Sequence, residues 1–254
     1  VLYGLSFIKN HDFFVLNQST YSKNKLNGSS LPIVCRSAHL KGLFFTKPDF
    51  QNNKKTDLPS FLFFPKPNNN GRLSSCDLQY IAYGEEMEFQ KGYKCSIRNP
   101  WYVVPSVWIP EGFALRQVHD FPKLILNSSD ATCTDTIHRL RFKNVNKSTN
   151  IVSSFINSMT FAFSEVFGRS YGGGVLTFEP SEIEGLPIFI PNKNQLRLDK
   201  IDDFLRERSI ESALDYVDKE ILINGLKMPM EKVQVLRNIW KKLKMRRIGR
   251  KRSN

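Results

Sequence analysis

The organisation of this chain is decided by one stretch, Phe167-Gly168-Arg169-Ser170-Tyr171-Gly172-Gly173-Gly174-Val175-Leu176-Thr177-Phe178-Glu179-Pro180. Residues 151–167, which lead into it, predict a helix with one buried face, because apolar side chains recur there at intervals of three and four. The expected buried face consists of Ile151, Phe155, Ile156, Met159, Phe163 and Val166. Gly168 stands where a left-handed helix cap is expected. Residues 175–178 are expected to form a strand.

The glycine triplet between helix and strand is the first candidate site. Gly172, Gly173 and Gly174 allow the backbone to take positive φ or to pass very close to another group. Arg169 and Tyr171 stand just before this bare backbone with a guanidinium group and an aromatic ring, which suit phosphates and bases. The alternative is a flexible hairpin turn, which a glycine triplet taken alone would favour.

The surrounding residues match a longer pattern. The passage resembles the C-terminal target-recognition region of bacterial γ-class adenine-N6 DNA methyltransferases from type II restriction–modification systems. In that family a helix with Asn-Ser, here Asn157-Ser158, leads into Gly-Arg-x-Tyr-Gly-x-Gly, here residues 168–174. A strand follows, and then Glu-Pro-x-Glu and Leu-Pro, here residues 179–182 and 186–187. The resemblance covers most of residues 1–190 and is sharpest at residues 91–102 and 157–187.

The resemblance implies a DNA-binding role. Complete enzymes of this family move a methyl group from S-adenosylmethionine to N6 of adenine in a short DNA sequence. The recognition region grips the duplex and reads base edges while the adenine is flipped out. Double-stranded DNA is the expected partner, with contacts expected from Arg169, Tyr171, Gly172, Gly173, Gly174, Arg98, Trp101, Tyr102, Arg36 and Lys41.

The tetrapeptide Asn99-Pro100-Trp101-Tyr102 departs from the family's catalytic motif, Asn-Pro-Pro followed by an aromatic residue. The second proline is absent, and residues 94–98 are not a buried apolar strand. Trp101 and Tyr102 are therefore predicted to lie in a strand that packs or contacts DNA. No glycine loop follows a buried strand in the way an S-adenosylmethionine site requires. The chain is thus expected to be a fragment without catalytic or cofactor residues, and its partner methyltransferase domain is expected upstream.

Composition agrees with a nucleic-acid partner. The net charge is +13 and 41% of the residues are hydrophobic, which indicates a globular protein that binds a polyanion. No apolar run is long enough to span a bilayer and no signal peptide is visible, so a cytoplasmic protein without a membrane partner is expected. The cysteines and histidines are scattered without metal-ligand spacing, so no metal site is expected.

The expected fold class is α+β. A mixed recognition domain with short strands, residues 1–190, would be followed by a small helical appendage, residues 191–254. The last expected helix opens after Pro229 and ends in a basic tail, which is either a phosphate-tracking arm or a solvated, frayed end. Its charges are Lys241, Lys242, Lys244, Arg246, Arg247, Arg250, Lys251 and Arg252.

Two other functions remain open from the sequence. The first is a stand-alone specificity subunit that serves a separate methyltransferase or nuclease. An internal duplication of the recognition region would favour this interpretation, and no such repeat is visible in the sequence. An RNA-binding module is the remaining reading, and charge alone supports it.

Overall fold

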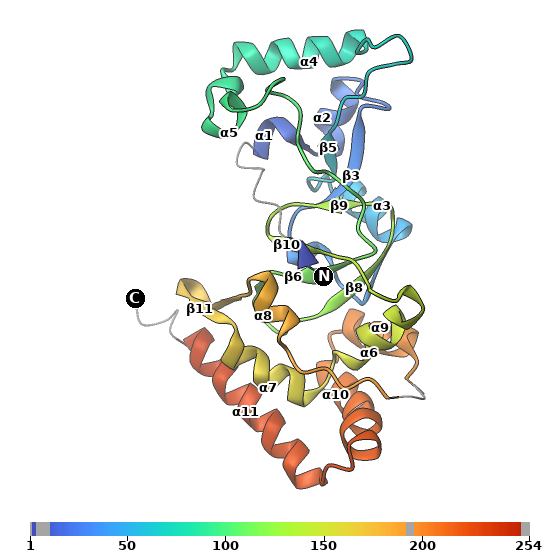
Figure 1. Ribbon diagram of the computed structural model, residues 1–254, viewed down its shortest axis with the longest axis vertical. Coiled ribbons are helices and arrows are strands. Elements are labelled where there is room, and N and C mark those ends of the chain that lie inside the picture. The colour runs from blue at the N-terminus through green and yellow to red at the C-terminus, as the bar shows by residue number, and fades with distance from the viewer. Residues whose placement is uncertain (1, 4–10, 192–195, 250–254) are drawn as a thin grey trace.

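The computed structural model describes residues 2–3, 11–191 and 196–249. It has an α+β fold, as expected, in which three small sheets are interleaved with helices (Figure 1). The central sheet has the order β1-β10-β6-β8-β4, with bounds Leu2–Tyr3, Ile137–Leu140, Gly112–Leu115, Leu124–Ser128 and Phe44–Thr46. Its β4–β8 pair is parallel and its other pairs are antiparallel, so the sheet is mixed.

A second sheet lies towards the top of Figure 1. Its order is β2-β5-β3-β9, with bounds Val15–Leu16, Phe61–Phe63, Ser30–Val34 and Thr132–Cys133. The helices of this half are α1, α2, α3, α4 and α5, with bounds His11–Phe14, Gln18–Lys23, Lys47–Lys55, Ser75–Glu86 and Tyr93–Ser96. Phe13 is fully buried at the centre, where its ring stacks on Tyr80 with 4.8 Å between centroids. Aromatic packing thus fixes α1 against α4.

The third sheet is the smallest and has the order β11-β12-β7, with bounds Arg169–Tyr171, Val175–Thr177 and Gln117–Val118. Helices dominate the half of the molecule around it, at the bottom of Figure 1. They are α6, α7, α8, α9, α10 and α11, with bounds Ser148–Ser154, Ser158–Phe167, Pro180–Glu184, Leu198–Arg206, Ile210–Asp218 and Met230–Gly249. The helices expected after residue 191 are therefore confirmed.

The predicted continuous helix over residues 151–167 is wrong in one respect, because the segment is divided into α6 and α7. Asn157 is extended, and its side chain caps α7 by accepting a hydrogen bond from the backbone N–H of Thr160 at 2.8 Å. The break resets the helical phase, so Phe163 and Val166 are 39% and 68% exposed. Phe161 is instead buried against the rest of the core.

The left-handed cap expected at Gly168 is also wrong, because this residue is extended with φ −76° and ψ 156°. Its lack of a side chain has a different cause. A Cβ at this position would lie 2.8 Å from the side chain of Leu176 and 2.9 Å from that of Phe178. Gly168 therefore allows β12 to pack closely against the end of α7.

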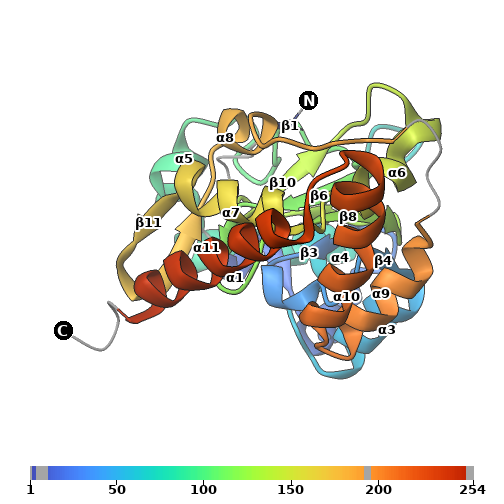
Figure 2. The same cartoon turned by 90° about the horizontal axis from the view of Figure 1, so that it is seen from below.

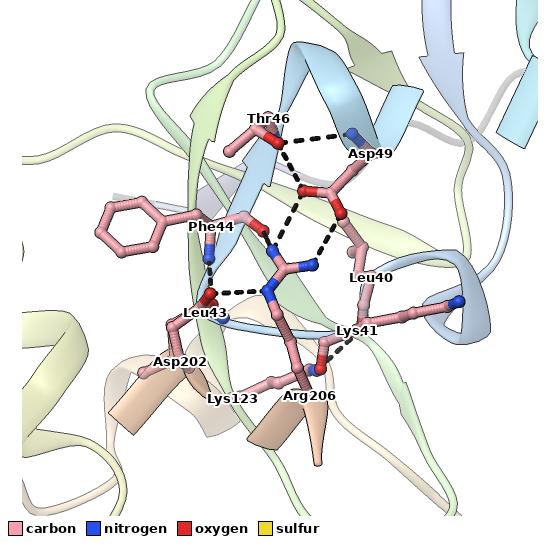
Figure 3. Close-up of polar contacts among 9 residues, drawn as sticks. All are labelled: Leu40, Lys41, Leu43, Phe44, Thr46, Asp49, Lys123, Asp202 and Arg206. Atoms are coloured by element: carbon pink, nitrogen blue, oxygen red, sulfur yellow. Dashed lines mark hydrogen bonds and ion pairs between the residues drawn. The ribbon is translucent and has the colours of Figure 1, made fainter. Parts of the chain in front are cut away.

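A polar cluster joins α9 to the N-terminal half of the chain (Figure 3). Arg206 donates from Nε to Asp202 at 2.6 Å, and its two terminal nitrogens donate to Asp49 at 2.7 and 3.0 Å. Asp202 in turn accepts from the backbone N–H groups of Leu43 and Phe44 at 2.5 and 3.1 Å. The cluster connects α9 to the neighbouring β4 and α3, and its two partners Arg206 and Asp49 are 157 residues apart in sequence.

Asp49 gives this cluster a defined pH dependence. Burial opposes ionisation of its carboxyl, but hydrogen bonds from Arg206 and Thr46 outweigh burial, so the pKa of Asp49 is lowered. A carboxyl whose pKa is lower in the folded state stabilises the fold above its unfolded pKa. That contribution is lost as the pH falls through the folded pKa.

We predict that Asp49→Asn lowers the free energy of unfolding at pH 7 by roughly 1–3 kcal/mol, since charge-assisted hydrogen bonds are lost. The difference from wild type should shrink as the pH falls below about 4, where the carboxyl of the unfolded wild-type chain takes up a proton while the folded one still resists it. Urea unfolding of both proteins between neutral and acidic pH measures it. A difference that stays constant down to pH 3 would contradict the role given to the Asp49 carboxylate.

Candidate nucleic-acid interface

The glycine stretch forms a β-hairpin. Strands β11 and β12 pair antiparallel, with Arg169 opposite Thr177 and Tyr171 opposite Val175, and Gly172–Gly174 form the turn between them. Strand β11 is the edge of its sheet and is exposed along its whole length. The strand expected after the glycines is thus confirmed, and the triplet closes a two-stranded ribbon at the surface.

A positive φ explains why two of the three turn positions are occupied by glycine. Gly173 and Gly174 have φ of 79° and 74°, a left-handed region that residues with a side chain rarely adopt. A Cβ on Gly174 would also lie 3.1 Å from Cα of Ile248 in α11, whereas a Cβ on Gly172 or Gly173 would meet nothing within 4 Å. The turn is therefore in contact with the protein at Gly174 and open to solvent at Gly172 and Gly173.

Arg169 and Tyr171 lie two residues apart on β11 and so point to the same face of the ribbon. Tyr171 is 56% exposed. Arg169 donates from Nε to Glu182 of α8 at 2.7 Å, and this hydrogen bond raises the pKa of the guanidinium. The contact orients an exposed cation next to an exposed aromatic ring.

The structure places Arg36 close to this sheet and Lys41 elsewhere. Arg36 is exposed and precedes Ser37, whose hydroxyl donates to the backbone oxygen of Gln117 in β7 at 2.9 Å. Lys41 is exposed beside a cavity of about 510 Å³ that Arg206 and Arg208 also line. The structure thus brings Arg36, but not Lys41, to the sheet that carries the hairpin.

Arg98, Trp101 and Tyr102 form a separate group after α5. The strand expected at Trp101 and Tyr102 is wrong, because these residues lie in turns that follow a cis Asn99–Pro100 bond. Trp101 packs on Phe13, with 4.9 Å between ring centroids, and donates from Nε1 to Glu85 at 3.1 Å. The guanidinium of Arg98 lies over the ring of Phe14 at 5.5 Å. The ring of Trp101 therefore packs against the core of this half and is only partly exposed.

The two groups nevertheless share one side of the molecule. In Figure 1, α5 and β11 both lie at the left, one above the other, and the C-terminal end of α11 lies beside β11. Figure 2 shows the same elements together on the left after a 90° turn.

Sequence reasoning missed two exposed apolar side chains on this side. Tyr93 and Ile97, one helical turn apart at α5, are 80% and 66% exposed. An available signal was the short basic run around them, with Lys91, Lys94 and Arg98, since basic residues lie mostly at the surface.

The basic tail is divided by the structure. Lys241 pairs with Glu211 at 2.9 Å, Lys244 pairs with Asp120, and Arg247 is buried. Lys242 and Arg246 are exposed. The remaining basic residues, Arg250, Lys251 and Arg252, lie outside the described residues. Part of the positive charge of the tail is therefore paired or buried within the fold and is not freely solvated.

No group of three or more His, Cys, Asp or Glu side chains with the geometry of a metal site occurs among the described residues. None of the helices in the described part of the chain is long and apolar enough to cross a bilayer. Burial raises the pKa of the Cys35 thiol to about 12, so this cysteine is not an activated nucleophile.

We predict that Gly174→Ala lowers the free energy of unfolding by about 1–2 kcal/mol through its positive φ, with a further cost from the contact with Ile248. Gly172→Ala, at an open position without positive φ, should change it by less than about 0.5 kcal/mol. Urea unfolding of the two variants gives the comparison. Equal stability of the two would show that the turn is not held as described.

Comparisons with known proteins agree with the hairpin motif and the fold. The family model described as "Type II methyltransferase M.Eco57I, C-terminal domain" matches residues 9–222. The type II methyltransferase M.AccI of Acinetobacter calcoaceticus is 28% identical over 182 residues, a match that covers 68% of this chain and 32% of that protein. The chain therefore spans about a third of the length of this relative.

A solved structure shows the same fold. The type IIG restriction endonuclease BpuSI superposes with a TM-score of 0.58 at 13% identity, over 100% of this chain and 31% of that one. Because the family model covers most of the sequence, including the Asn157-Ser158 helix and the glycine hairpin, the chain belongs to the family of type II methyltransferase C-terminal domains named after M.Eco57I.

Proposed function

We propose that this chain is the target-recognition part of an adenine-specific (N6) DNA methyltransferase of a restriction–modification system, and that it binds double-stranded DNA sequence-specifically. The hairpin is the observation that carries the proposal. A two-stranded β-ribbon fits the major groove of B-DNA, where an arginine reads guanine through two hydrogen bonds. Here the hairpin forms the outer edge of a three-stranded sheet, in which β12 also pairs with β7, and its exposed edge strand β11 presents Arg169 and Tyr171 on one face.

The second group of residues extends the proposed contact. Arg98, Trp101 and Tyr102 follow α5, which lies on the same side of the molecule as β11 (Figures 1 and 2). A duplex along this side would meet the hairpin at one end and the α5 region at the other. The net charge of +13 supports a polyanionic ligand, and phosphate contacts would fix the register of the protein on it.

Methyl transfer belongs to the rest of the parent protein in this proposal. The relative M.AccI is about three times as long as the matched region, which supports a catalytic domain on the same polypeptide over a stand-alone specificity subunit. S-adenosylmethionine does not fit the residues described here. The glycine triplet closes a hairpin at an exposed edge strand, whereas a cofactor cradle needs a loop between a buried strand and a helix. We place the parent protein in the cytoplasm.

We predict that the isolated chain neither binds S-adenosylmethionine nor methylates DNA. Isothermal titration calorimetry with the cofactor measures the first, and transfer of labelled methyl groups to DNA measures the second. Micromolar cofactor binding by this chain would contradict the proposal that cofactor binding and methyl transfer belong to another part of the parent protein.

Sequence-specific binding is tested by selection from a pool of random duplexes with the 254-residue chain. The most enriched sequence is called the selected duplex below. We predict that Arg169→Ala weakens binding to the selected duplex by roughly five- to 150-fold, the range for loss of an arginine–base contact. Its thermal unfolding midpoint should move by less than about 2 °C, since exposed ion pairs contribute little to stability.

Arg197→Ala is the matched control. Arg197 is also an exposed arginine paired with a nearby carboxylate, that of Asp199, but it precedes α9 and lies outside the hairpin. This variant removes the same charge and should retain most of the affinity. If both variants lose affinity equally, or if the selection enriches no sequence, binding rests on charge alone and the recognition role of the hairpin is wrong.

A further inference from the structure

Arg247 of α11 joins three segments at the turn of the hairpin. Its guanidinium donates from Nε and Nη2 to the carboxylate of Glu165 in α7 at 2.9 and 2.7 Å. Nη1 donates to the backbone oxygen of His119 at 3.1 Å and to that of Gly174 in the glycine turn. Both charged side chains are buried, with 3% of Arg247 and 4% of Glu165 exposed.

The contact with Gly174 places the turn directly on α11. The backbone of Gly174 lies so close to Ile248 that an added Cβ would stand 3.1 Å from its Cα. The carbonyl of the same glycine accepts the hydrogen bond from Arg247. One end of the turn is therefore fixed by backbone packing and by a charged donor, while Gly172 and Gly173 remain open.

The rest of α11 determines where Arg247 stands. Residues spaced by three and four form the face of α11 that packs inwards: Val233, Arg237, Trp240, Lys244 and Arg247. Arg237 donates to Ser158, the first residue of α7, at 3.2 Å, and to the buried Asp218 at 2.8 Å. Trp240 packs on Phe161 with 5.0 Å between centroids. Because α11 is held along α7 in this way, Arg247 has a fixed position beside the glycine turn.

We propose that Arg247 is a positioning residue that preorganises the glycine hairpin for DNA, so that this side chain contributes to target binding without itself touching the duplex. The inference rests on the proposed function of the hairpin. It concerns a helix that begins after residues 9–222, the region the family model matches. A turn already held in its binding conformation loses less conformational entropy on binding, and affinity is higher for that reason.

A direct phosphate contact by Arg247 is disfavoured by its existing hydrogen bonds. A guanidinium has five N–H donors, and Arg247 makes four hydrogen bonds to Glu165, His119 and Gly174. Arg246, next to it on the exposed face of the helix, is the residue suited to a direct contact. The two neighbours therefore have different expected effects on the salt dependence of binding.

The test uses the 254-residue chain with three variants. Arg247→Met alone would leave the buried Glu165 carboxylate unpaired and is avoided, since an unpaired buried charge is strongly destabilising. The double variant Glu165→Met with Arg247→Met keeps the net charge and the volume of the site but removes the hydrogen bonds to Gly174 and His119. Arg247→Lys retains a cation for Glu165 without the planar fork. Arg246→Met is the control on the same helix.

Hydrogen exchange followed by mass spectrometry reports the hairpin directly. In the double variant, amides of residues 169–177 should exchange on the order of tenfold faster, while those of the four-stranded sheet keep their wild-type rates. Arg247→Lys should give an intermediate increase, and Arg246→Met should give none. General destabilisation would accelerate both regions together, so a selective change separates positioning from a merely structural role.

Binding to the selected duplex supplies the second readout. The double variant should bind roughly three- to thirtyfold more weakly with an unchanged salt slope, since no phosphate contact is lost. Wild-type exchange in the hairpin for both the double variant and Arg247→Lys would overturn the proposal. So would a salt slope in the double variant that falls by about one unit, the result expected if Arg247 itself neutralised a phosphate.

The two proposals fail in distinguishable ways. If Arg169→Ala binds the selected duplex like wild type, the recognition role of the hairpin is wrong, whatever Arg247 does. If Arg169→Ala weakens binding and the double variant does not, the hairpin reads DNA but Arg247 does not position it.

Discussion

The pairing of α7 with α11 is the interaction on which the arrangement of the C-terminal half depends. Two buried arginines hold it. Arg237 reaches Ser158 at the start of α7 and Asp218 at the end of α10, and Arg247 reaches Glu165 towards the end of α7. Burying such charges is costly unless they are paired and hydrogen-bonded, so a shift of either helix by one turn would leave them unpaired. The pairs therefore act on register more than on net stability. Because the hairpin follows α7 directly and rests on α11, its position is fixed by the same contacts.

The family motif around the hairpin divides into residues with opposite tasks. Asn157 and Ser158 are fully buried, where one caps α7 and the other donates to Asp218 at 2.5 Å. Arg169 and Tyr171 are exposed on the edge strand. Gly168 and Gly174 serve close packing, against β12 and α11 respectively. A motif read as a single recognition signal thus consists mainly of scaffold, with an exposed pair of side chains at its end.

The N-terminal half contributes a different kind of surface. Its core is an aromatic cluster around Phe13, to which Trp101 contributes its ring, and α5 projects from it with Tyr93 and Ile97 exposed. Through Asp49, the Arg206 cluster connects this half to α9. The surfaces around α5 and β11, on the left of Figure 1, therefore belong to two halves that are joined by buried polar contacts. In the proposed complex with DNA, the hairpin and the exposed side chains of α5 would each contact the duplex from a part of the fold that buried contacts hold in place.

The sequence by itself determined the α+β class, the C-terminal helices, the glycine turn and the family, because these follow from local spacing and from a motif with fixed order. It misplaced what depends on contacts distant in the chain. The helix of residues 151–167 is broken because Asn157 and Ser158 satisfy partners, including Asp218, that no local pattern reveals. The basic tail read as one charged segment, yet Arg247 is buried because Glu165, His119 and Gly174 converge on it from three other segments. Periodicity reports which face of an element is apolar, whereas only the tertiary structure decides which charges find a buried partner.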